Sequence, residues 1–386
     1  MRCSPRCASC SGDYNAPVKA SLQDELRRIQ DGPGATAFLR SNVILDTARR
    51  RWPVIADVTV GCALRCRFCH RVRRDPARLA SAELFERIAT EVLPRASEVA
   101  FGARHEPLLH PDLPERIRGL ADARDRLRTD TAICVLTSGV LLEPDLATRF
   151  ATCGVDHVLF SIDSTDEATY SRLRPPATWA GLKPRLAAFM AARRDDRPTV
   201  AVQALVLRST VPHLRSTLEE LAAMGVRRFN TTVVEWETRQ VADEVVSMRG
   251  PDAPWLAREF EALSATAQAL GVAFRPPRTA PPAVPGEVWP ILAEGTIWDE
   301  AATRRERPTV CAASWGKVRI DDRGFVFPCF RILDPRHAWG NLLERSFAEI
   351  VNGEVAVRAR TMLLEGRAPN PVCAGCCWGP APRPAG

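Results

Sequence analysis

The chain has 386 residues, of which 46% are hydrophobic and 26% are charged, and it carries 13 cysteines and a formal net charge of +7 at pH 7. This length and apolar content allow a large core and exclude extensive disorder, and no apolar run approaches the roughly 20 residues that a membrane-spanning helix needs. The N-terminus shows no signal-peptide pattern, so we expect a cytoplasmic protein with no membrane partner, whose cysteines serve metal or catalytic sites rather than disulfides.

The positive charge comes almost entirely from arginine, because only three of the 53 basic residues are lysine. The arginines are scattered among acidic residues, as in "RRDPARLASAELFERI". This interleaving is typical of solvated helix faces and argues against nucleic-acid binding.

Residues 1–51 are expected to form an N-terminal segment that holds a cysteine cluster, "CSPRCASC", and a helix near residues 20–30. Cys3, Cys7 and Cys10 of this cluster follow no predicted strand. The sequence leaves open whether they bind metal.

From residue 52 to 240, apolar runs rich in β-forming residues alternate with Ala/Leu/Arg patterns typical of helices. The candidate strands are 53–60, 97–102, 131–139, 156–163, 199–207 and 228–236, with helices such as 81–93 and 213–225 between them. This alternation predicts right-handed βαβ units, and strands that are apolar on both faces are typical of a buried parallel sheet. We therefore expect an α/β fold.

The alternation stops after residue 240. Residues 241–310 hold a predicted helix near 254–270 and a proline-dense stretch at 275–290, which is typical of a linker or lid. From 311 to 386 we expect a small α+β domain, with a hairpin at 317–330, a short helix near 344–352 and a second set of cysteines.

Three cysteines directly follow the first predicted strand, in the stretch "GCALRCRFCH" at C-x3-C-x2-C spacing: Cys62, Cys66 and Cys69. Three thiolates on a short loop can hold a [4Fe–4S] cluster and leave its fourth iron open, and Arg65, Arg67, His70 and Arg71 would offset the cluster's negative charge. The alternative is zinc with His70 as fourth ligand. It is disfavoured because residues adjacent in the chain chelate one ion poorly.

This cysteine loop resembles that of radical S-adenosylmethionine (SAM) enzymes, in which an aromatic residue, here Phe68, precedes the third cysteine. The resemblance implies a partial (β/α)6 TIM barrel whose open iron chelates SAM. One electron from the cluster would then cleave SAM to a 5′-deoxyadenosyl radical that abstracts hydrogen from the substrate.

Further elements at the strand ends carry the same resemblance. "FGARHEPLLHPDL" keeps the glutamate and proline of a Gly-Gly-Glu-Pro element but has Arg104 and His105 in place of the glycines. "LTSG" resembles Thr-Asn-Gly, and "FSIDSTDEATYSRLRP" resembles a Ser-x-Asp element followed by arginines that could pair with the SAM carboxylate. The residues implied as SAM contacts are Glu106, Ser138, Ser161, Asp163, and Arg172 or Arg174. The alternative roles are a helix cap for Glu106 and a turn for Asp163.

The second set of cysteines is Cys311, Cys329, Cys373 and Cys376, with Cys377 as an alternative to Cys376. Four thiolates can close a [4Fe–4S] site. With "DRGFVFPCF" and "WGNLLERSFAEI", this region resembles the Twitch domain, the half-length relative of the SPASM extension, and implies one auxiliary cluster. Zinc on the same four thiolates is the alternative. Cys134 and Cys153 are expected to be small buried residues.

The reaction is expected from the cofactors that the resemblance implies. No cobalamin-binding domain is visible, which argues against cobalamin-dependent methylation, and no leader-peptide domain is visible in the first fifty residues, which argues against a ribosomal peptide substrate. The resemblance to radical SAM proteins with a single Twitch cluster, which include dehydrogenases of aminocyclitols, implies dehydrogenation of a small polar metabolite of aminocyclitol or carbohydrate type. The auxiliary cluster would accept an electron, and Glu235 or Glu237 would be the base. An electron donor such as flavodoxin or ferredoxin is expected as a partner. The alternatives are an epimerase, a peptide-crosslinking enzyme that takes a peptide as its partner, and a zinc-binding nucleic-acid module.

Overall fold

The computed structural model describes residues 40, 43–45, 47, 51–69, 77–233, 241–246, 251–277, 311 and 313–374. The predicted helix near residues 20–30, the cysteines of the N-terminal cluster and most of the proline-dense stretch lie outside these residues.

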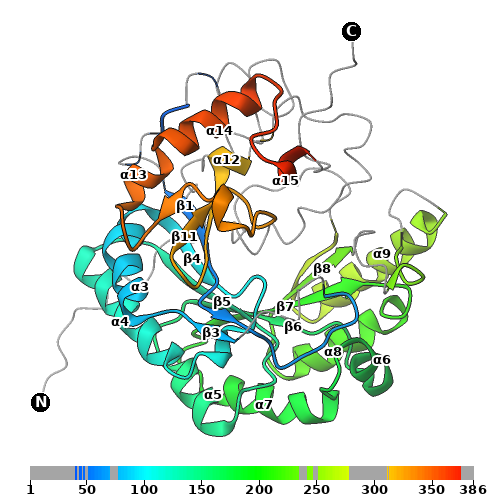
Figure 1. Ribbon diagram of the computed structural model, residues 1–386. Coiled ribbons are helices and arrows are strands. Elements are labelled where there is room, and N and C mark those ends of the chain that lie inside the picture. Colours follow the sequence, from blue (N-terminus) through cyan, green and yellow to red (C-terminus); the bar gives the residue numbers. More distant parts are fainter. Residues whose placement is uncertain are drawn as a thin grey trace, which may run out of the picture.

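The six predicted strands form one parallel sheet in chain order (Figure 1). They are β1 (Trp52–Ala56), β4 (Ala96–Phe101), β5 (Ala132–Thr137), β6 (His157–Ser161), β7 (Thr199–Val206) and β8 (Arg228–Val233). Nearly all their side chains are buried or half-buried, as expected for strands with helices on one side and a filled interior on the other. The predicted partial (β/α)6 barrel is confirmed.

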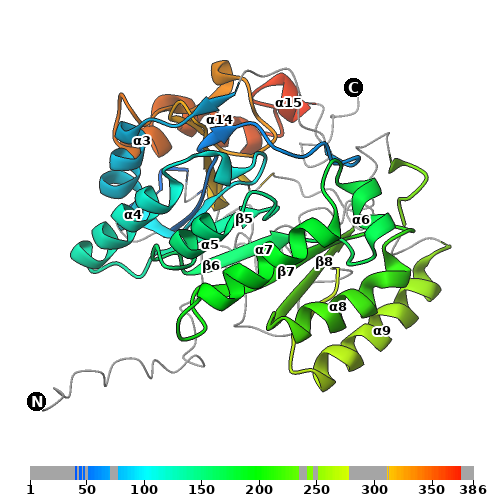
Figure 2. The same cartoon turned by 90° about the horizontal axis from the view of Figure 1, so that it is seen from below.

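Helices between the strands cover the outside of this sheet, as Figures 1 and 2 show from two directions. The apolar residues Leu113, Ile117 and Leu120 recur at helical spacing in α4 and are fully buried, which fixes the face that packs on the strands. The covering helices are α3 (Ala82–Arg87), with a π-helical continuation at Ile88–Val92, α4 (Leu113–Leu127), α5 (Pro144–Ala151), α6 (Glu167–Leu173), α7 (Trp179–Ala192), α8 (Leu214–Ala223) and α9 (Ala253–Ala269).

Several of these helices begin at the residue types that favour a helix N-terminus. The side chains of Ser81, Asp166 and Thr178 accept a hydrogen bond from the first turns of α3, α6 and α7. Each of these bonds satisfies one of the backbone N–H groups that a helix leaves unpaired at its start.

The C-terminal hairpin continues the same sheet on the far side of β1. Strand β10 (Val318–Ile320) pairs in parallel with β1, and β11 (Phe325–Phe327) and β12 (Gly340–Asn341) follow in antiparallel order. At the other edge, β9 (Ala273–Arg275) pairs with β8, so the described residues place ten strands in this sheet. The predicted hairpin is confirmed, while its pairing with β1 was not foreseen. A two-stranded sheet of β2 (Thr59–Val60) and β3 (Arg78–Leu79) lies beside the cysteine loop.

Short helices close the C-terminal region above β1 and β11 (Figure 1): α12 (Ala313–Gly316), α13 (Phe347–Val351), α14 (Glu354–Leu364) and α15 (Pro371–Ala374). Arg360 of α14 is fully buried and joins them, since its guanidinium donates to the backbone oxygens of Ser314 at 3.0 Å, Val351 at 2.6 Å and Val43 at 2.8 Å. Trp52 of β1 contacts Phe347 edge-to-face, with ring centroids 6.2 Å apart. Together they join the C-terminal helices to the barrel.

Of the helices that the structure describes, none combines the length and the hydropathy that crossing a bilayer would require.

Candidate active site

The cysteine loop, residues 61–69, follows β2 and lies against the segment that leaves α6. The backbone N–H of Arg65 donates to the carbonyl oxygen of Pro175 at 2.6 Å, and that of Arg67 donates to Leu173 at 3.0 Å. The N–H of Cys69 donates to the carbonyl oxygen of Cys66 at 3.1 Å, which folds the second half of the loop into a turn. These contacts hold the loop in place through its backbone.

Cys66 is the most buried of the three thiols, at 8% exposure. Burial raises the pKa of the Cys66 thiol to about 11, and the nearby charge of Arg174 opposes this rise. Because metal ligation requires the thiolate, a bound cluster would have to stabilise the deprotonated form. Within the described residues, no three Cys, His, Asp or Glu side chains are already gathered around a single metal position. The donor set, three thiols on one loop beside arginines, fits an iron–sulfur cluster.

Arg174 and Asp163 form a buried ion pair next to this loop. The Nε of Arg174 lies 2.6 Å from Asp163 Oδ2, its Nη2 lies 2.9 Å from Oδ1, and both residues are at most 6% exposed. The Nη1 of Arg174 points to the Sγ of Cys66 at 3.9 Å, and the guanidinium stacks over the ring of Phe68 at 5.1 Å. Four predicted site residues from three segments are thus brought together, and Arg174 places a positive charge beside a predicted cluster ligand.

Glu106 lies across the ends of β4 and β5. Its Oε1 accepts hydrogen bonds from Thr137 Oγ1 at 2.6 Å and Leu108 N at 3.2 Å. Its Oε2 accepts from Ser138 N at 2.9 Å and Ser138 Oγ at 2.5 Å. The carboxylate is 3% exposed and caps the short 3₁₀ helix Pro107–Leu109, so the alternative capping role is realised. All four acceptor positions are in use, and only the rotatable hydroxyls could release one to an ammonium group.

Gly102 makes this arrangement possible. It has φ +86°, and a Cβ at this position would lie 2.7 Å from the backbone oxygen of Leu136 and 2.6 Å from Pro107 Cδ. Only glycine tolerates both the backbone conformation and the close approach. The turn after β4 therefore lies directly on the end of β5, where Thr137 and Ser138 reach Glu106.

We expect the Glu106→Gln substitution to weaken both the fold and SAM binding. The new amide group must face one of the donors on Thr137, Ser138 or Leu108, so the free energy of unfolding should fall by about 1–3 kcal/mol in urea titrations without SAM. SAM affinity, measured by equilibrium dialysis, should fall by on the order of tenfold or more if the carboxylate also binds the amino group.

The matched control for Glu106→Gln is Glu115→Gln, because Glu115 forms an exposed ion pair with Arg149. This control should change stability by at most about 1 kcal/mol. Unchanged SAM affinity in Glu106→Gln would leave Glu106 with a purely structural role.

Arg172 points away from Arg174 and pairs with Glu244, a buried residue that the sequence analysis missed. Glu244 also lies 3.7 Å from Arg67 Nη1 of the cysteine loop and accepts a hydrogen bond from Ser209. Burial acts to raise the pKa of Glu244, but the hydrogen bonds from Arg172 and Ser209 outweigh it and lower the pKa. No local sequence pattern marks Glu244.

The predicted SAM contact Ser161 lies at the end of β6 and is half-buried.

Tyr170 is a second residue that the sequence analysis missed. It is fully buried one turn before Arg174, and its hydroxyl finds no hydrogen-bond partner among the described residues. Burial raises the pKa of Tyr170 further above its usual value, and the charges of Asp163, Cys66 and Glu106 add to this rise while Arg174 opposes it. A buried donor of this kind, amid the predicted SAM contacts, fits a site that a bound group completes.

The structure describes three of the four cysteines predicted for the auxiliary cluster. Cys311 precedes α12, Cys329 follows β11 and Cys373 lies in α15, and all three are half-buried. The N–H of Arg331 donates to the sulfur of Cys329 at 3.4 Å, and the N–H of Cys373 donates to Asn370 Oδ1 at 3.0 Å. The fourth predicted ligand, Cys376, and the alternative Cys377 lie outside the described residues, as do His70, Arg71, Glu235 and Glu237.

Comparison with known proteins adds two family matches. Residues 57–221 match the radical SAM superfamily, and residues 311–377 match the SPASM iron–sulfur cluster-binding domain. The expected cofactors are thereby confirmed: SAM with a [4Fe–4S] cluster for the first domain and auxiliary iron–sulfur chemistry for the second.

Similar proteins align with most of the chain. A PqqA peptide cyclase of Xanthomonas oryzae is 28% identical over 348 residues, 86% of this chain and 82% of that protein. A PqqA peptide cyclase of Streptomyces rochei is 27% identical over 286 residues, 72% of this chain and 68% of that protein. Among solved structures, Streptococcus suis SuiB bound to S-adenosylmethionine has the same fold, with a TM-score of 0.58, 16% identity, and coverage of 92% of this chain and 80% of that one.

The expected function, dehydrogenation of a small polar metabolite of aminocyclitol or carbohydrate type, is wrong. The relatives that align with 72–86% of this chain are named as peptide cyclases. The expectation rested on the resemblance to single-Twitch-cluster enzymes and on the absence of a visible leader-peptide domain in the first fifty residues, and neither feature fixes the substrate class.

The motif, the fold and both family matches lead to the same conclusion. The chain carries a radical SAM domain at residues 57–221 and a SPASM iron–sulfur cluster-binding domain at residues 311–377.

Proposed function

We propose that this protein is a peptide-maturing radical SAM enzyme that joins two positions of one peptide substrate. The observation that carries the proposal is the extent of its similarity to PqqA peptide cyclases, which covers 86% of this chain. At 86% of this chain, the similarity extends well beyond the radical SAM match at residues 57–221, so it is not confined to that part.

In this proposal, Cys62, Cys66 and Cys69 hold the cluster at which SAM binds. When bound, the cluster and SAM supply a one-electron cleavage that removes a hydrogen atom from the substrate. Arg174 stabilises the thiolate of Cys66, and Asp163 holds Arg174 in place. Glu106 and Ser138 lie together at the ends of β4 and β5, where they can receive the amino group of SAM.

Closing a bond between two side chains removes two hydrogens from the peptide. The first leaves as a hydrogen atom and ends in 5′-deoxyadenosine. The second would leave as a proton, and the auxiliary cluster, which Cys311, Cys329, Cys373 and Cys376 would hold, would supply an acceptor for the remaining electron. Glu235 and Glu237, which follow β8 in the sequence, are candidate bases for that proton.

Mass spectrometry of turnover reactions tests the proposal. The anaerobically reconstituted protein is incubated with SAM, a reductant and synthetic peptides encoded by short reading frames next to its gene. We expect one peptide to lose the mass of two hydrogen atoms, with a fragmentation pattern that shows an internal crosslink and with equimolar 5′-deoxyadenosine. The variant in which Cys62, Cys66 and Cys69 are alanine is the zero-turnover control. A peptide that exchanges one hydrogen with solvent at unchanged composition would instead identify an epimerase.

A further inference from the structure

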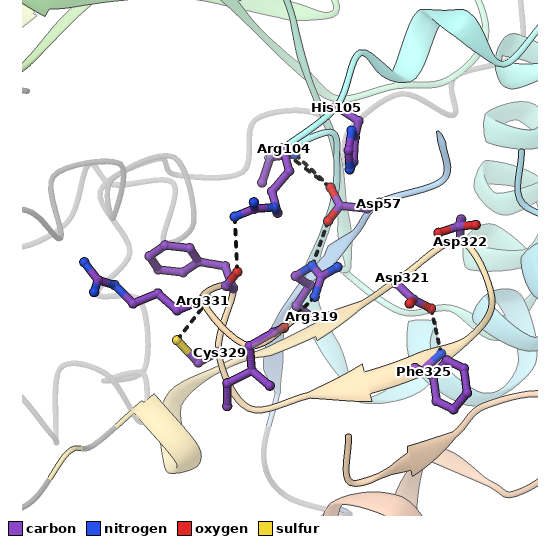
Figure 3. A network of polar contacts seen from close by, with 12 residues as sticks. Asp57, Arg104, His105, Arg319, Asp321, Asp322, Phe325, Cys329 and Arg331 are labelled. Atoms are coloured by element: carbon purple, nitrogen blue, oxygen red, sulfur yellow. Dashed lines mark hydrogen bonds and ion pairs between the residues drawn. The ribbon is translucent and has the colours of Figure 1, made fainter. Parts of the chain in front are cut away.

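Asp57 is the first residue after β1, and its carboxylate joins the turn after β4 to strand β10, which is far away in the sequence (Figure 3). Its Oδ1 accepts hydrogen bonds from the backbone N–H groups of Ala103 at 3.3 Å and Arg104 at 3.4 Å, in the turn that leads to Glu106. Its Oδ2 accepts from the Nε of Arg319 in β10 at 2.7 Å. Because Asp57 is 2% exposed, almost all its hydrogen bonding is with the protein.

Arg319 in turn holds the segment that carries Cys329. Its Nη1 donates to the carbonyl oxygen of Ile332 at 3.0 Å, and its guanidinium stacks over the ring of Phe327 at 4.8 Å. Phe327 precedes Cys329 by two residues and Ile332 follows it by three. Arg319 therefore contacts the chain on both sides of this predicted auxiliary-cluster ligand.

The turn before Glu106 and the segment around Cys329 also contact each other directly. The Nη1 of Arg104 lies 3.5 Å from the carbonyl oxygen of Phe330, the residue after Cys329 (Figure 3). The backbone N–H of Asp57 donates to Ile320 of β10 at 2.9 Å, which continues the β1–β10 pairing up to the ion pair. A continuous set of short contacts thus runs from the Cys329 segment through Arg319 and Asp57 to the turn before Glu106.

We propose that Asp57 and Arg319 are a positioning pair that couples the auxiliary cluster to the SAM site. One carboxylate fixes the turn before Glu106, and one guanidinium fixes the segment around Cys329. A shift in either turn is therefore transmitted to the other. Hydrogen-bonded residues behind a metal ligand tune the metal's properties, so SAM binding should be visible at the auxiliary cluster. The proposal stands whether or not the substrate is a peptide.

The redox potential of the auxiliary cluster provides the test. In the anaerobically reconstituted protein, the midpoint potential is measured by EPR-monitored titration with and without S-adenosylhomocysteine, which carries the amino and carboxylate groups of SAM but is not cleaved. We expect the native protein to show a shift on addition of this probe. The Asp57→Asn/Arg319→Gln protein removes both charges together, so neither charge is left buried alone. It should retain its iron and lose the shift.

The matched control is the ion pair Arg78–Asp322, which also joins the first half of the chain to the C-terminal hairpin, with Nε and Oδ2 2.8 Å apart. Asp322 lies in the β10–β11 turn, at the end of the hairpin opposite Cys329. Arg78→Gln/Asp322→Asn should keep the shift. If the Asp57/Arg319 double variant does not fold, Arg319→Lys replaces it: a single ammonium nitrogen takes the place of the two guanidinium nitrogens that bind Asp57 and Ile332, so the shift should be reduced. The proposal is overturned if the native protein shows no shift, if either Asp57 or Arg319 variant keeps the full shift, or if the control loses it equally.

Discussion

Replacing Cys62, Cys66 and Cys69 together with alanine is expected to abolish SAM cleavage. No other thiols in the described residues lie on that loop, and an iron–sulfur cluster cannot be held without thiolates. The production of 5′-deoxyadenosine, measured by chromatography under reducing anaerobic conditions, should fall below detection. Bound iron should fall by the content of one cluster, because Cys311, Cys329 and Cys373 lie on other elements and retain the auxiliary cluster.

The matched control for this triple variant is Cys153→Ala. Cys153 is buried, and its thiol donates to the carbonyl oxygen of Phe150 at 3.1 Å, away from the cysteine loop. Its replacement should leave both iron content and SAM cleavage at the native level. Native 5′-deoxyadenosine production by the triple variant would refute the assignment of the cysteine loop, while complete loss of iron would show that the auxiliary site depends on the first one.

Arg174→Met is expected to cause the largest loss of stability among single substitutions at the site. It removes the partner of Asp163, which is fully buried, and leaves an uncompensated carboxylate whose remaining described contact is the N–H of Leu205 at 3.1 Å. Breaking a buried ion pair from one side costs about 3–5 kcal/mol. Urea denaturation of the cluster-free protein, followed by circular dichroism, should show a loss of this size in the free energy of unfolding.

Arg172→Met is the comparison for Arg174→Met, since Arg172 lies two residues earlier, in the last turn of α6, and Arg174 is the residue that follows this helix. The side chain of Arg172 is 39% exposed, and its partner Glu244 keeps the hydrogen bond from Ser209 and the nearby Arg67. We expect a loss of about 1 kcal/mol for this variant. Adding Asp163→Asn to Arg174→Met should recover part of the lost stability. Equal losses of unfolding free energy for the two arginine variants, with no recovery from Asp163→Asn, would show that the buried Asp163–Arg174 pair contributes no more to stability than the partly exposed Arg172–Glu244 pair.

Local sequence patterns were sufficient to predict the parallel sheet with its helices and the position of the cysteine loop, while the barrel was implied by the family resemblance. The six strands are continuous apolar runs separated by amphipathic helices, so their burial in a parallel sheet depends on residues that are close in the chain. Cys62, Cys66 and Cys69 also lie within eight consecutive residues, so their spacing can be read directly from the sequence. Family resemblance also pointed to Glu106, Ser138, Asp163 and Arg174, and the structure brings each of them into contact with a predicted site residue.

Only the tertiary structure decided which partner each of the buried charges has. Arg172 and Arg174 are equivalent in sequence terms, but the turn of α6 directs one toward Glu244 and the other toward Asp163 and Cys66. Asp57 and Arg319 are 262 residues apart, and they meet because β10 pairs with β1. A buried charge requires an opposite charge or a hydrogen-bond donor at close range, and long-range strand pairing determines which residue can provide it. The sequence by itself therefore determined the barrel and its cofactor chemistry, while the contacts that join the two cysteine-bearing regions depend on how distant strands align.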